Sequence, residues 1–473
     1  MHIRIISLIS LFCLLSILVD AQNLRISLKG DSTIVGKKIR LSIFEDNISY
    51  LEKEIDSLTI EDSVSYFNET IEETSLMSIK IDAFSYNFLA KKGATYSMRI
   101  LPFNFSISDS VNTLFYKIPL PIVIEENSDN NLNSNIFIID SIIEDRVVRL
   151  KNIRGLRNRK AIDSLKAEVF AFANKIEDSY IKDYAIYSIG QMEYFSNGEN
   201  EKQLKKELFY NKPILYHNLA YMDCFEAIFG SYFSMGNRAI SHYYLDNLLV
   251  ETNYFALIDS LGRDTILRNE VFRELVFLRG MKELYANSLY EPMYIDAMLE
   301  KFIYQTKFSE HRKIAKNLLY FYSQRRHFGI KASEFSLKDI YNNYITLDKY
   351  KGKKLILSFV KLKEPSSLRE LNMLYSIKDS LQNDIEFLTI SCDNTLDALY
   401  NFLVNSKVGT RYKWDFAYFD NKWEILKKYN VIVFPTFLII DEKGNIISNP
   451  IRKPSEGSLL PFVEKKHINL QTK

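Results

Sequence analysis

The N-terminal part of the chain alternates between apolar and polar residues. In the stretches 39–43, 77–81 and 103–107 every second residue is apolar. A period of two is typical of strands that bury one face. We therefore predict a small antiparallel β-sandwich over residues 22–125. A polar segment rich in Asn, Ser and Asp follows this region, and we interpret residues 126–140 as a linker.

Beyond residue 140 the period of the apolar positions changes. Leu165, Val169 and Phe172 are three and four residues apart, and residues 272–284 repeat this spacing. Such spacing predicts amphipathic helices, and short breaks between them favour antiparallel neighbours. We expect an α-helical domain over residues 141–330. No repeat of fixed period is evident, although a superhelical repeat array stays open as an alternative.

From residue 331 onward the pattern predicts strands that alternate with helices. The apolar stretch KLILSFV (354–360) is typical of a buried central strand, and we predict IEFLTIS (385–391) as the next strand. Between them Pro365 stands where a helix would begin, a position that suits proline because no N–H group is needed there. We therefore predict an α/β domain with parallel strands over residues 331–473.

The first residues resemble a signal for export. Arg4 precedes an apolar, uncharged run from Ile5 to Val19, and small residues around Ala21 suit cleavage by a signal peptidase. We interpret residues 1–21 as a signal peptide and expect an exported protein without a transmembrane segment after cleavage. An uncleaved membrane anchor is the alternative, but the run is short of the about 20 residues that span a bilayer.

The small net charge and the absence of metal-binding motifs argue against several classes of function. The formal net charge is +2, which does not favour a nucleic-acid partner. Beyond residue 21 the cysteines are Cys224 and Cys392, and they form no CxxC pair. The six histidines are scattered and form no HExxH motif. We therefore expect no metal site and no cofactor. A hydrolase finds no support either, because there is no GxSxG motif.

Four segments in the C-terminal third carry a resemblance to a known family. They are Phe335–Leu337 with the turn Tyr350–Lys353, the strand Leu355–Phe359, the segment Val433–Asp441 and the hairpin Lys443–Ile446. In this order and spacing they resemble the thioredoxin superfamily, and within it the TlpA-like envelope disulfide reductases. The resemblance covers about residues 333–467. It implies a thioredoxin fold and a place in the periplasm or cell envelope of a Gram-negative bacterium.

The redox motif of that family, Trp-Cys-x-x-Cys, is absent. Counting from Phe359, the resemblance places Lys363 at the tryptophan position, Glu364 at the attacking cysteine and Ser367 at the resolving cysteine. Disulfide exchange needs a thiolate, which the carboxylate of Glu364 cannot replace. A negative charge at the start of a helix is worth about 0.3–1 kcal/mol, so Glu364 and Ser367 also suit an ordinary helix start.

The resemblance also implies a peptide-binding surface around a cis-proline. It places Pro435 at the cis-proline position, where substrate chains of the family pair with the backbone. The expected binding residues are Phe434, Pro435 and Thr436, together with Glu364 and Pro365 opposite them.

Two functions follow from these observations. The missing cysteine pair favours a binding or assembly protein, with a protein or peptide of the cell envelope as its partner. The alternative is a thiol–disulfide oxidoreductase that acts in envelope redox homeostasis through Cys392 or through a thiol of its partner. Cys392 follows a predicted strand, at the edge of an α/β sheet where ligands bind, whereas buried cysteines are generally inert.

The signal peptide gives a first testable prediction. We expect the exported protein to begin at Gln22, because the small residues before it suit a signal peptidase. Intact-mass measurement of the exported protein checks this directly. A mass that retains residues 1–21 would show that the segment remains as an anchor.

Overall fold

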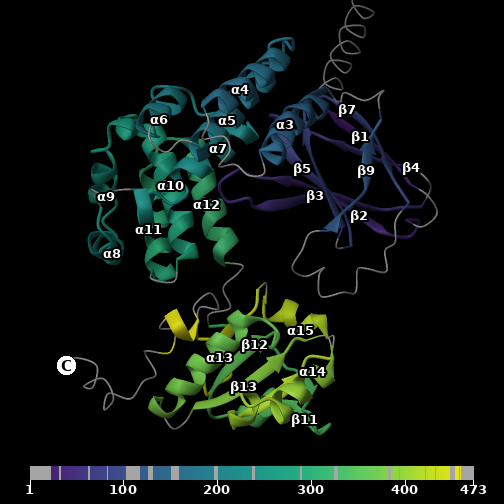
Figure 1. Ribbon diagram of the computed structural model, residues 1–473, viewed down its shortest axis with the longest axis vertical. Helices are drawn as coiled ribbons and strands as arrows, with labels where there is room; N and C mark the ends of the chain where they lie inside the picture. Colours follow the sequence, from purple (N-terminus) through teal and green to yellow (C-terminus); the bar gives the residue numbers. More distant parts are fainter. Residues whose placement is uncertain are drawn as a thin grey trace, which may run out of the picture. The chain divides into compact units, whose positions relative to one another are not determined.

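The computed structural model divides the chain into two compact units (Figure 1). One holds the N-terminal strands and the helices of the middle region, and the other holds the C-terminal sheet domain from Tyr320 onward. The structure describes residues 23–30, 34–61, 64–82, 84–102, 118–125, 131–150, 159–196, 201–236, 240–287, 290–323, 329–381, 385–393, 395–420, 422–431, 433–447, 453–456 and 459. The predicted signal peptide and the stretch 103–107 lie outside these residues.

The N-terminal strands form two sheets that enclose one apolar core. Their bounds are β1 (Leu24–Lys29), β2 (Lys38–Phe44), β3 (Glu52–Thr59), β4 (Val64–Glu69), β5 (Ser75–Ile81), β6 (Phe84–Ala90), β7 (Thr95–Ile100), β8 (Ile118–Pro119) and β9 (Ile122–Ile124). One sheet has the order β4-β1-β7-β9 and the other β3-β2-β5-β6-β8. The predicted alternation is found, since Ile39, Leu41, Ile79 and Ile81 are fully buried.

The pairing of these strands differs in part from the prediction. Neighbours such as β2 and β5 pair antiparallel, as expected, with Ile39 opposite Ile81. However, β1 pairs with β7 in parallel, and β6 pairs with β8 in parallel. Alternating polarity fixes which face of a strand is buried and carries no information on the direction of its neighbour, so the sequence pattern could not reveal these parallel pairs.

Helices make up the rest of this unit. Their bounds are α3 (Asn131–Arg149), α4 (Arg159–Ala173), α5 (Ser179–Ser196), α6 (Glu201–Phe209), α7 (Leu219–Phe229), α8 (His242–Val250), α9 (Tyr254–Leu261), α10 (Glu270–Ala286), α11 (Pro292–Gln305) and α12 (Ser309–Ser323), with a π-helical turn at Tyr232–Gly236 and a 3₁₀ turn at Thr265–Arg268. The predicted helical region is thus confirmed. Asparagine or serine side chains cap α7, α8 and α9 by accepting a backbone hydrogen bond.

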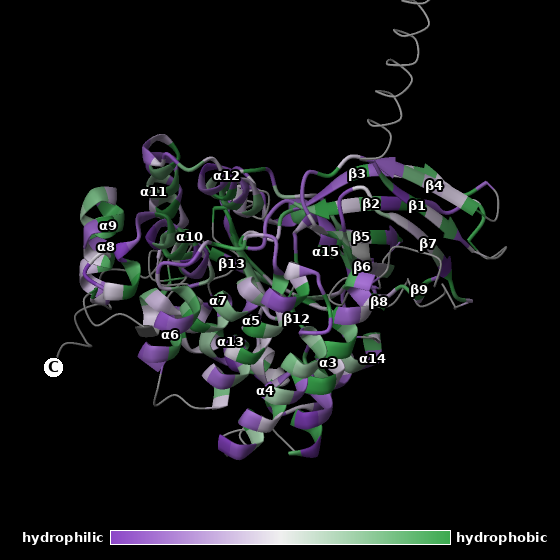
Figure 2. Cartoon of the chain, turned by 90° about the horizontal axis from the view of Figure 1, so that it is seen from above, coloured by the Kyte–Doolittle hydropathy of each residue, from purple (hydrophilic) through white to green (hydrophobic). Residues whose placement is uncertain are grey.

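Residues 131–140, the larger part of the segment 126–140 that we interpret as a linker, are helical. Helix α3 begins at Asn131, and its many apolar residues are visible in Figure 2. The polar residues at its start hold it to the sandwich. Asn133 accepts a hydrogen bond from the Leu89 N–H through Oδ1 and donates one to the Leu89 carbonyl through Nδ2, both at 2.9 Å. Polar composition, which indicated a linker, here supplies a contact between two elements.

The interior of the helical region is rich in aromatic rings. Phe229 on α7 and Phe272 on α10 meet edge to face, with ring centroids 5.3 Å apart. Phe209 at the end of α6 stacks on Phe272, with a centroid distance of 5.5 Å. Such pairs add about 0.5–1.5 kcal/mol each to the gain from burial. The abundance of phenylalanine in the sequence is thus partly explained by this core.

The second unit is built on a mixed six-stranded sheet of order β11-β10-β14-β13-β12-β15. The elements are β10 (Ser336–Lys338), β11 (Tyr344–Thr346), β12 (Lys354–Val360), α13 (Pro365–Ile377), β13 (Ile385–Ser391), α14 (Leu396–Tyr400), β14 (Asp415–Tyr418), α15 (Trp423–Lys428) and β15 (Thr436–Ile440). The strands β12, β13 and β14 pair in parallel, while β15 runs antiparallel to β12. The α/β prediction is confirmed. The helix expected after residue 459 lies outside the described residues.

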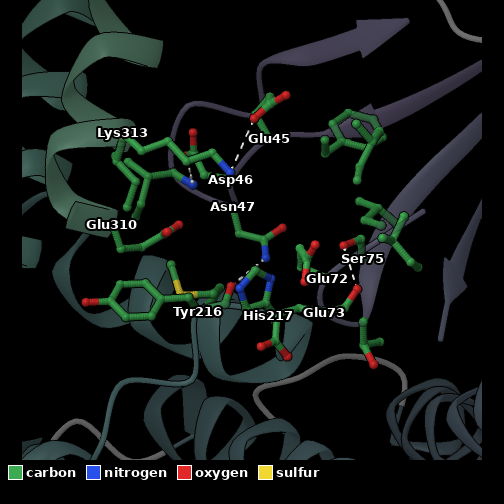
Figure 3. A pocket seen from close by; sticks show the side chains of 18 of the residues that line it. Glu45, Asp46, Asn47, Glu72, Glu73, Ser75, Tyr216, His217, Glu310 and Lys313 are labelled. Carbon is green, nitrogen blue, oxygen red and sulfur yellow. Dashed lines mark hydrogen bonds and ion pairs between the residues drawn. The ribbon is translucent and has the colours of Figure 1, made fainter. Parts of the chain in front are cut away.

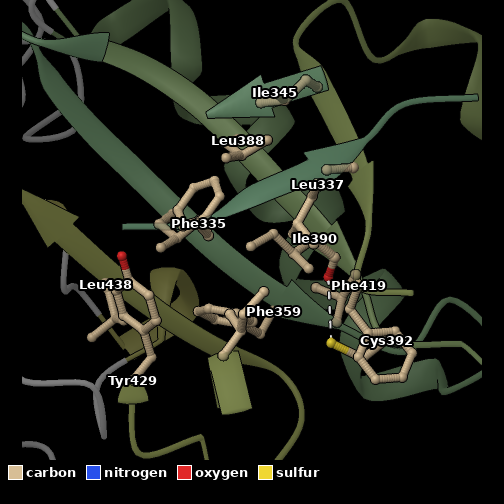
Figure 4. Close-up of a cluster of buried hydrophobic side chains, with 14 of the residues drawn as sticks. Phe335, Leu337, Ile345, Phe359, Leu388, Ile390, Cys392, Phe419, Tyr429 and Leu438 are labelled. Carbon is tan, nitrogen blue, oxygen red and sulfur yellow. Dashed lines mark hydrogen bonds between the residues drawn. The ribbon is translucent and has the colours of Figure 1, made fainter. Parts of the chain in front are cut away.

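Strand β12 contributes to apolar clusters on both faces of this sheet. Leu355, Leu357 and Phe359 belong to the larger cluster, which Figure 4 shows in part. Ile356 belongs to the smaller one, together with Leu374 of α13. Burial on both faces explains why the sequence of β12 is almost continuously apolar. The strand also delivers the chain to the loop that precedes α13.

Close packing in the helical region gives a prediction of stability. A methyl group added at Gly280 of α10 would lie 1.9 Å from the ring of Phe233, which is buried. We expect Gly280→Ala to lower the free energy of unfolding by about 1–3 kcal/mol, because overpacking outweighs the gain in helix propensity. Denaturant titration measures this change in the free energy of unfolding. In a Phe233→Leu background, Gly280→Ala should lower the free energy of unfolding by a smaller amount. An equal loss in both backgrounds would contradict the steric explanation.

Candidate functional site

The loop between β12 and α13 is held by a buried carboxylate. Asp393, at the end of β13, is 4% exposed. Its Oδ2 accepts a hydrogen bond from the Leu362 N–H at 2.9 Å and another from the Ser391 hydroxyl at 2.8 Å. The ends of two neighbouring strands are therefore joined at this point. The loop cannot move away without leaving a buried charge unpaired, which is costly.

The two residues at the expected cysteine positions, Glu364 and Ser367, lie at the start of the helix that follows. Glu364 is the N-cap of α13 with an extended backbone, and its side chain makes no capping hydrogen bond. That side chain is 41% exposed. Ser367 is fully buried, and its hydroxyl accepts a hydrogen bond from the Lys361 N–H at 3.3 Å. The helix start thus presents one accessible side chain and one that stabilises the loop.

The predicted proline segment has the expected backbone. The Phe434–Pro435 peptide bond is cis, as the resemblance implied. Pro435 and Thr436 are buried, and the Thr436 hydroxyl donates a hydrogen bond to the Val433 carbonyl at 2.6 Å. Val433 is 58% exposed. Of this segment, Val433 and the half-buried Phe434 are therefore the side chains that a partner could contact.

Lys361 connects the two segments, a role that sequence reasoning missed. Its Nζ lies 3.9 Å from the Glu364 carboxylate and 5.2 Å from the centroid of the Phe434 ring. The first contact is a weak ion pair and the second a cation–π contact. The structure therefore brings Glu364 and Phe434 to the same lysine. Pro365 is exposed at the first turn of α13. The position of Lys361 directly after a strand was the available signal.

Cys392 lies in the core, away from solvent. The residue is fully buried, and its Sγ contacts the Ile390 carbonyl at 3.8 Å (Figure 4). Burial raises the pKa of the Cys392 thiol well above its usual value, and the nearby Asp393 carboxylate raises it further. A thiol of this kind holds its proton at neutral pH. These features oppose a role for Cys392 as a nucleophile.

Cys224 is equally inaccessible. It lies on α7 and is fully buried, and burial raises the pKa of its thiol. Both Cys224 and Cys392 are free thiols, each in a different compact unit. Within the described residues, no group of three or more His, Cys, Asp or Glu residues could hold a metal ion. In the same part of the chain, every helix is too short or too polar to cross a membrane.

Known proteins are similar in sequence to part of the second unit. A family model described as thioredoxin-like matches residues 352–446. The thiol-disulfide oxidoreductase ResA of Bacillus thuringiensis subsp. konkukian (strain 97-27) is 27% identical over 148 residues, which cover 30% of this chain and 80% of that protein. The probable glutathione peroxidase 2 of Arabidopsis thaliana is 34% identical over 124 residues, which cover 25% of this chain and 70% of that protein.

Solved structures match a similar share of the chain. The thioredoxin domain of the thiol-disulfide oxidoreductase BVU-2223 from Bacteroides vulgatus is 19% identical, with 29% of this chain and 98% of that chain covered and a TM-score of 0.24. A putative thiol:disulfide interchange protein DsbE from Chlorobium tepidum is 18% identical, with 28% of this chain and 93% of that chain covered and a TM-score of 0.24. With its α/β sheet and the match of the family model, the chain belongs to the thioredoxin-like family through its C-terminal domain.

Proposed function

We propose that the C-terminal domain binds a protein or peptide and performs no thiol–disulfide exchange. The observation that carries this proposal is the absence of an accessible thiol at the start of α13. The resemblance places Glu364 and Ser367 where the TlpA-like proteins have cysteines, and the nearest thiol in sequence, Cys392, is buried with a raised pKa. Without a thiolate no mixed disulfide can form.

The binding surface that we propose consists of the accessible residues around Lys361. Glu364 and Pro365 lie on one side and Phe434 on the other, with Pro435 and Thr436 fixing the backbone beneath. Charged and aromatic side chains held close together suit recognition of a peptide. The partner would be a protein of the cell envelope, since we also propose that the first 21 residues export the chain to the periplasm of a Gram-negative bacterium.

A redox role is the second candidate, because the names of several relatives state thiol-disulfide oxidoreductase activity. In this chain such a role would need Cys392 to become exposed, or a thiol from the partner. The hydrogen-bonded position of Asp393, which follows Cys392 directly, opposes local opening of this strand end. The binding role therefore accounts for more of the observations.

Crosslinking tests the proposed surface. We expect a photoreactive amino acid at Val433, which is 58% exposed, to capture a partner in the envelope fraction. Val404, which is 41% exposed on the same unit, provides the matched control position. Lys361→Ala should reduce capture at position 433, because Lys361 contacts both sides of the surface. Equal capture from positions 433 and 404 would contradict a specific surface.

The burial of the cysteines gives a prediction of reactivity. In the folded protein we expect neither Cys224 nor Cys392 to react with a thiol reagent over minutes, because burial raises both pKa values. Both should react after unfolding in denaturant, as counted by mass spectrometry. A folded protein that labels at Cys392 at the rate of an exposed thiol would support the redox candidate.

Replacing Glu364 and Ser367 by cysteine should install dithiol chemistry. A thiol at position 364 would lie at a helix N-terminus and near Lys361, and both features lower a thiol pKa from its usual value of about 8.5. A thiol at position 367 would lie one turn further along the helix, within reach of the first. We expect a reversible disulfide in the double variant, and turnover limited by the missing tryptophan and by substrate fit.

Reduction of a model protein disulfide measures this outcome. Wild type should show no turnover, and Cys392→Ser should not differ from it. Turnover by wild type that is lost in Cys392→Ser would favour the redox candidate over the binding role. A double variant that folds but forms no disulfide would show that residues 364–367 do not correspond to the redox motif.

A further inference from the structure

A cavity lies within the first unit, between the β-sandwich and the helices that pack beside it (Figure 3). Its volume is about 330 Å³, which is enough for an amino-acid side chain together with part of its backbone. The walls come from the end of β2, from the loop between β4 and β5, and from α7 and α12. Pockets between structural layers are common places for ligands.

Part of the cavity lining is apolar and buried, and we call this part the apolar base. Ile71, Met222 and Ile314 line it, and each of them is at most 3% exposed. These three residues come from different elements, so the sandwich and the helices both contribute apolar side chains to the lining. A ligand that fills this part must itself carry an apolar portion.

The walls are held in place by polar contacts. Asp46 accepts hydrogen bonds from the N–H groups of Ile48 and Ser49, from the Ser49 hydroxyl and from the Asn317 amide. Asn47 donates to the Tyr216 carbonyl at 2.8 Å. The charge of Asp46 is therefore satisfied within the protein, and its role is structural.

Three other ionisable side chains line the cavity and have no partner among the described residues. They are Glu73, His217 and Glu310. In Figure 3 they surround the same space, with Glu310 on α12 and Glu73 in the β4–β5 loop. The lysine of the lining, Lys313, is already paired with Glu45 at 3.3 Å. The cavity thus combines an apolar base with carboxylates that are available to a cation.

We propose that this cavity binds a lysine or arginine side chain of a partner protein. The aliphatic stem of such a side chain would lie on the apolar base, and its charged head would be placed between Glu73 and Glu310. Long basic side chains combine these two properties, and charge complementarity favours them over acidic or neutral groups. The site is separate from the thioredoxin-like domain and does not depend on the function proposed for it.

Titration of the complete exported chain with a short peptide tests the proposal. The probe is the N-acetylated tetrapeptide amide Ala-Lys-Lys-Ala, and the comparison is the same peptide with both lysines acetylated. We expect saturable binding of the first, measured by calorimetry at low salt, and no binding of the second. The ring signals of His217, assigned with a His217→Gln variant, should shift in nuclear magnetic resonance spectra. Saturable binding that leaves these signals unchanged would place the peptide elsewhere and overturn the proposal.

Charge-matched variants decide whether the cavity is responsible. Glu73→Gln with Glu310→Gln should lower the affinity about 5- to 30-fold, because two ion pairs of about 0.5–1 kcal/mol each are lost. The control is Glu177→Gln with Glu251→Gln, which removes the same charge from exposed positions outside the cavity. An equal loss in both double variants, no saturable binding of the lysine peptide to wild type, or equal binding of the acetylated peptide would overturn the proposal.

Discussion

Strand β12 is buried on both faces of its sheet, and the loop that leaves it is tied to the neighbouring strand by the carboxylate of Asp393. Burial fixes the strand, because moving it by one residue would transfer Ile356 to the wrong cluster. The carboxylate then fixes the loop, because a buried acceptor that loses its donors carries a large desolvation cost. The start of α13 and the side chain of Lys361 take their positions from these two constraints. Ser367 adds a third, since its hydroxyl accepts the Lys361 N–H.

The same constraints limit the chemistry that this edge of the sheet can perform. A nucleophile must be accessible and must lose its proton, and the fully buried Cys392 meets neither condition. Glu364 is accessible, but a carboxylate cannot exchange with a disulfide. This edge then offers a charged lysine and an aromatic ring, Lys361 and Phe434, beside the cis peptide bond of Pro435. Rigid surfaces of this kind lose little conformational freedom on binding, which supports the binding role that we propose.

Part of this structure could be predicted from the sequence. The strands β12 and β15 are almost continuously apolar, and Pro365 marks the start of α13. Periodicity describes one element at a time, however. It gave no sign that β1 pairs with β7 in parallel, or that Asn133 fastens α3 to the sandwich. Periodicity did not reveal the role of Lys361 either, because its contact with Phe434 joins residues that are far apart in the sequence.

Polar contacts of this kind also explain why a cavity persists between the sandwich and the helices. An interface of apolar residues would close on itself, since protein interiors pack at nearly crystalline density. Here directional hydrogen bonds hold the loop after β2: the Asn317 amide donates to the Asp46 carboxylate, and the Asn47 amide donates to the Tyr216 carbonyl. Their geometry sets the separation of the two layers. The buried Asp46 cannot shift to fill the space without breaking bonds to its own loop. The volume beside it is therefore a consequence of how the sandwich is attached to the helices.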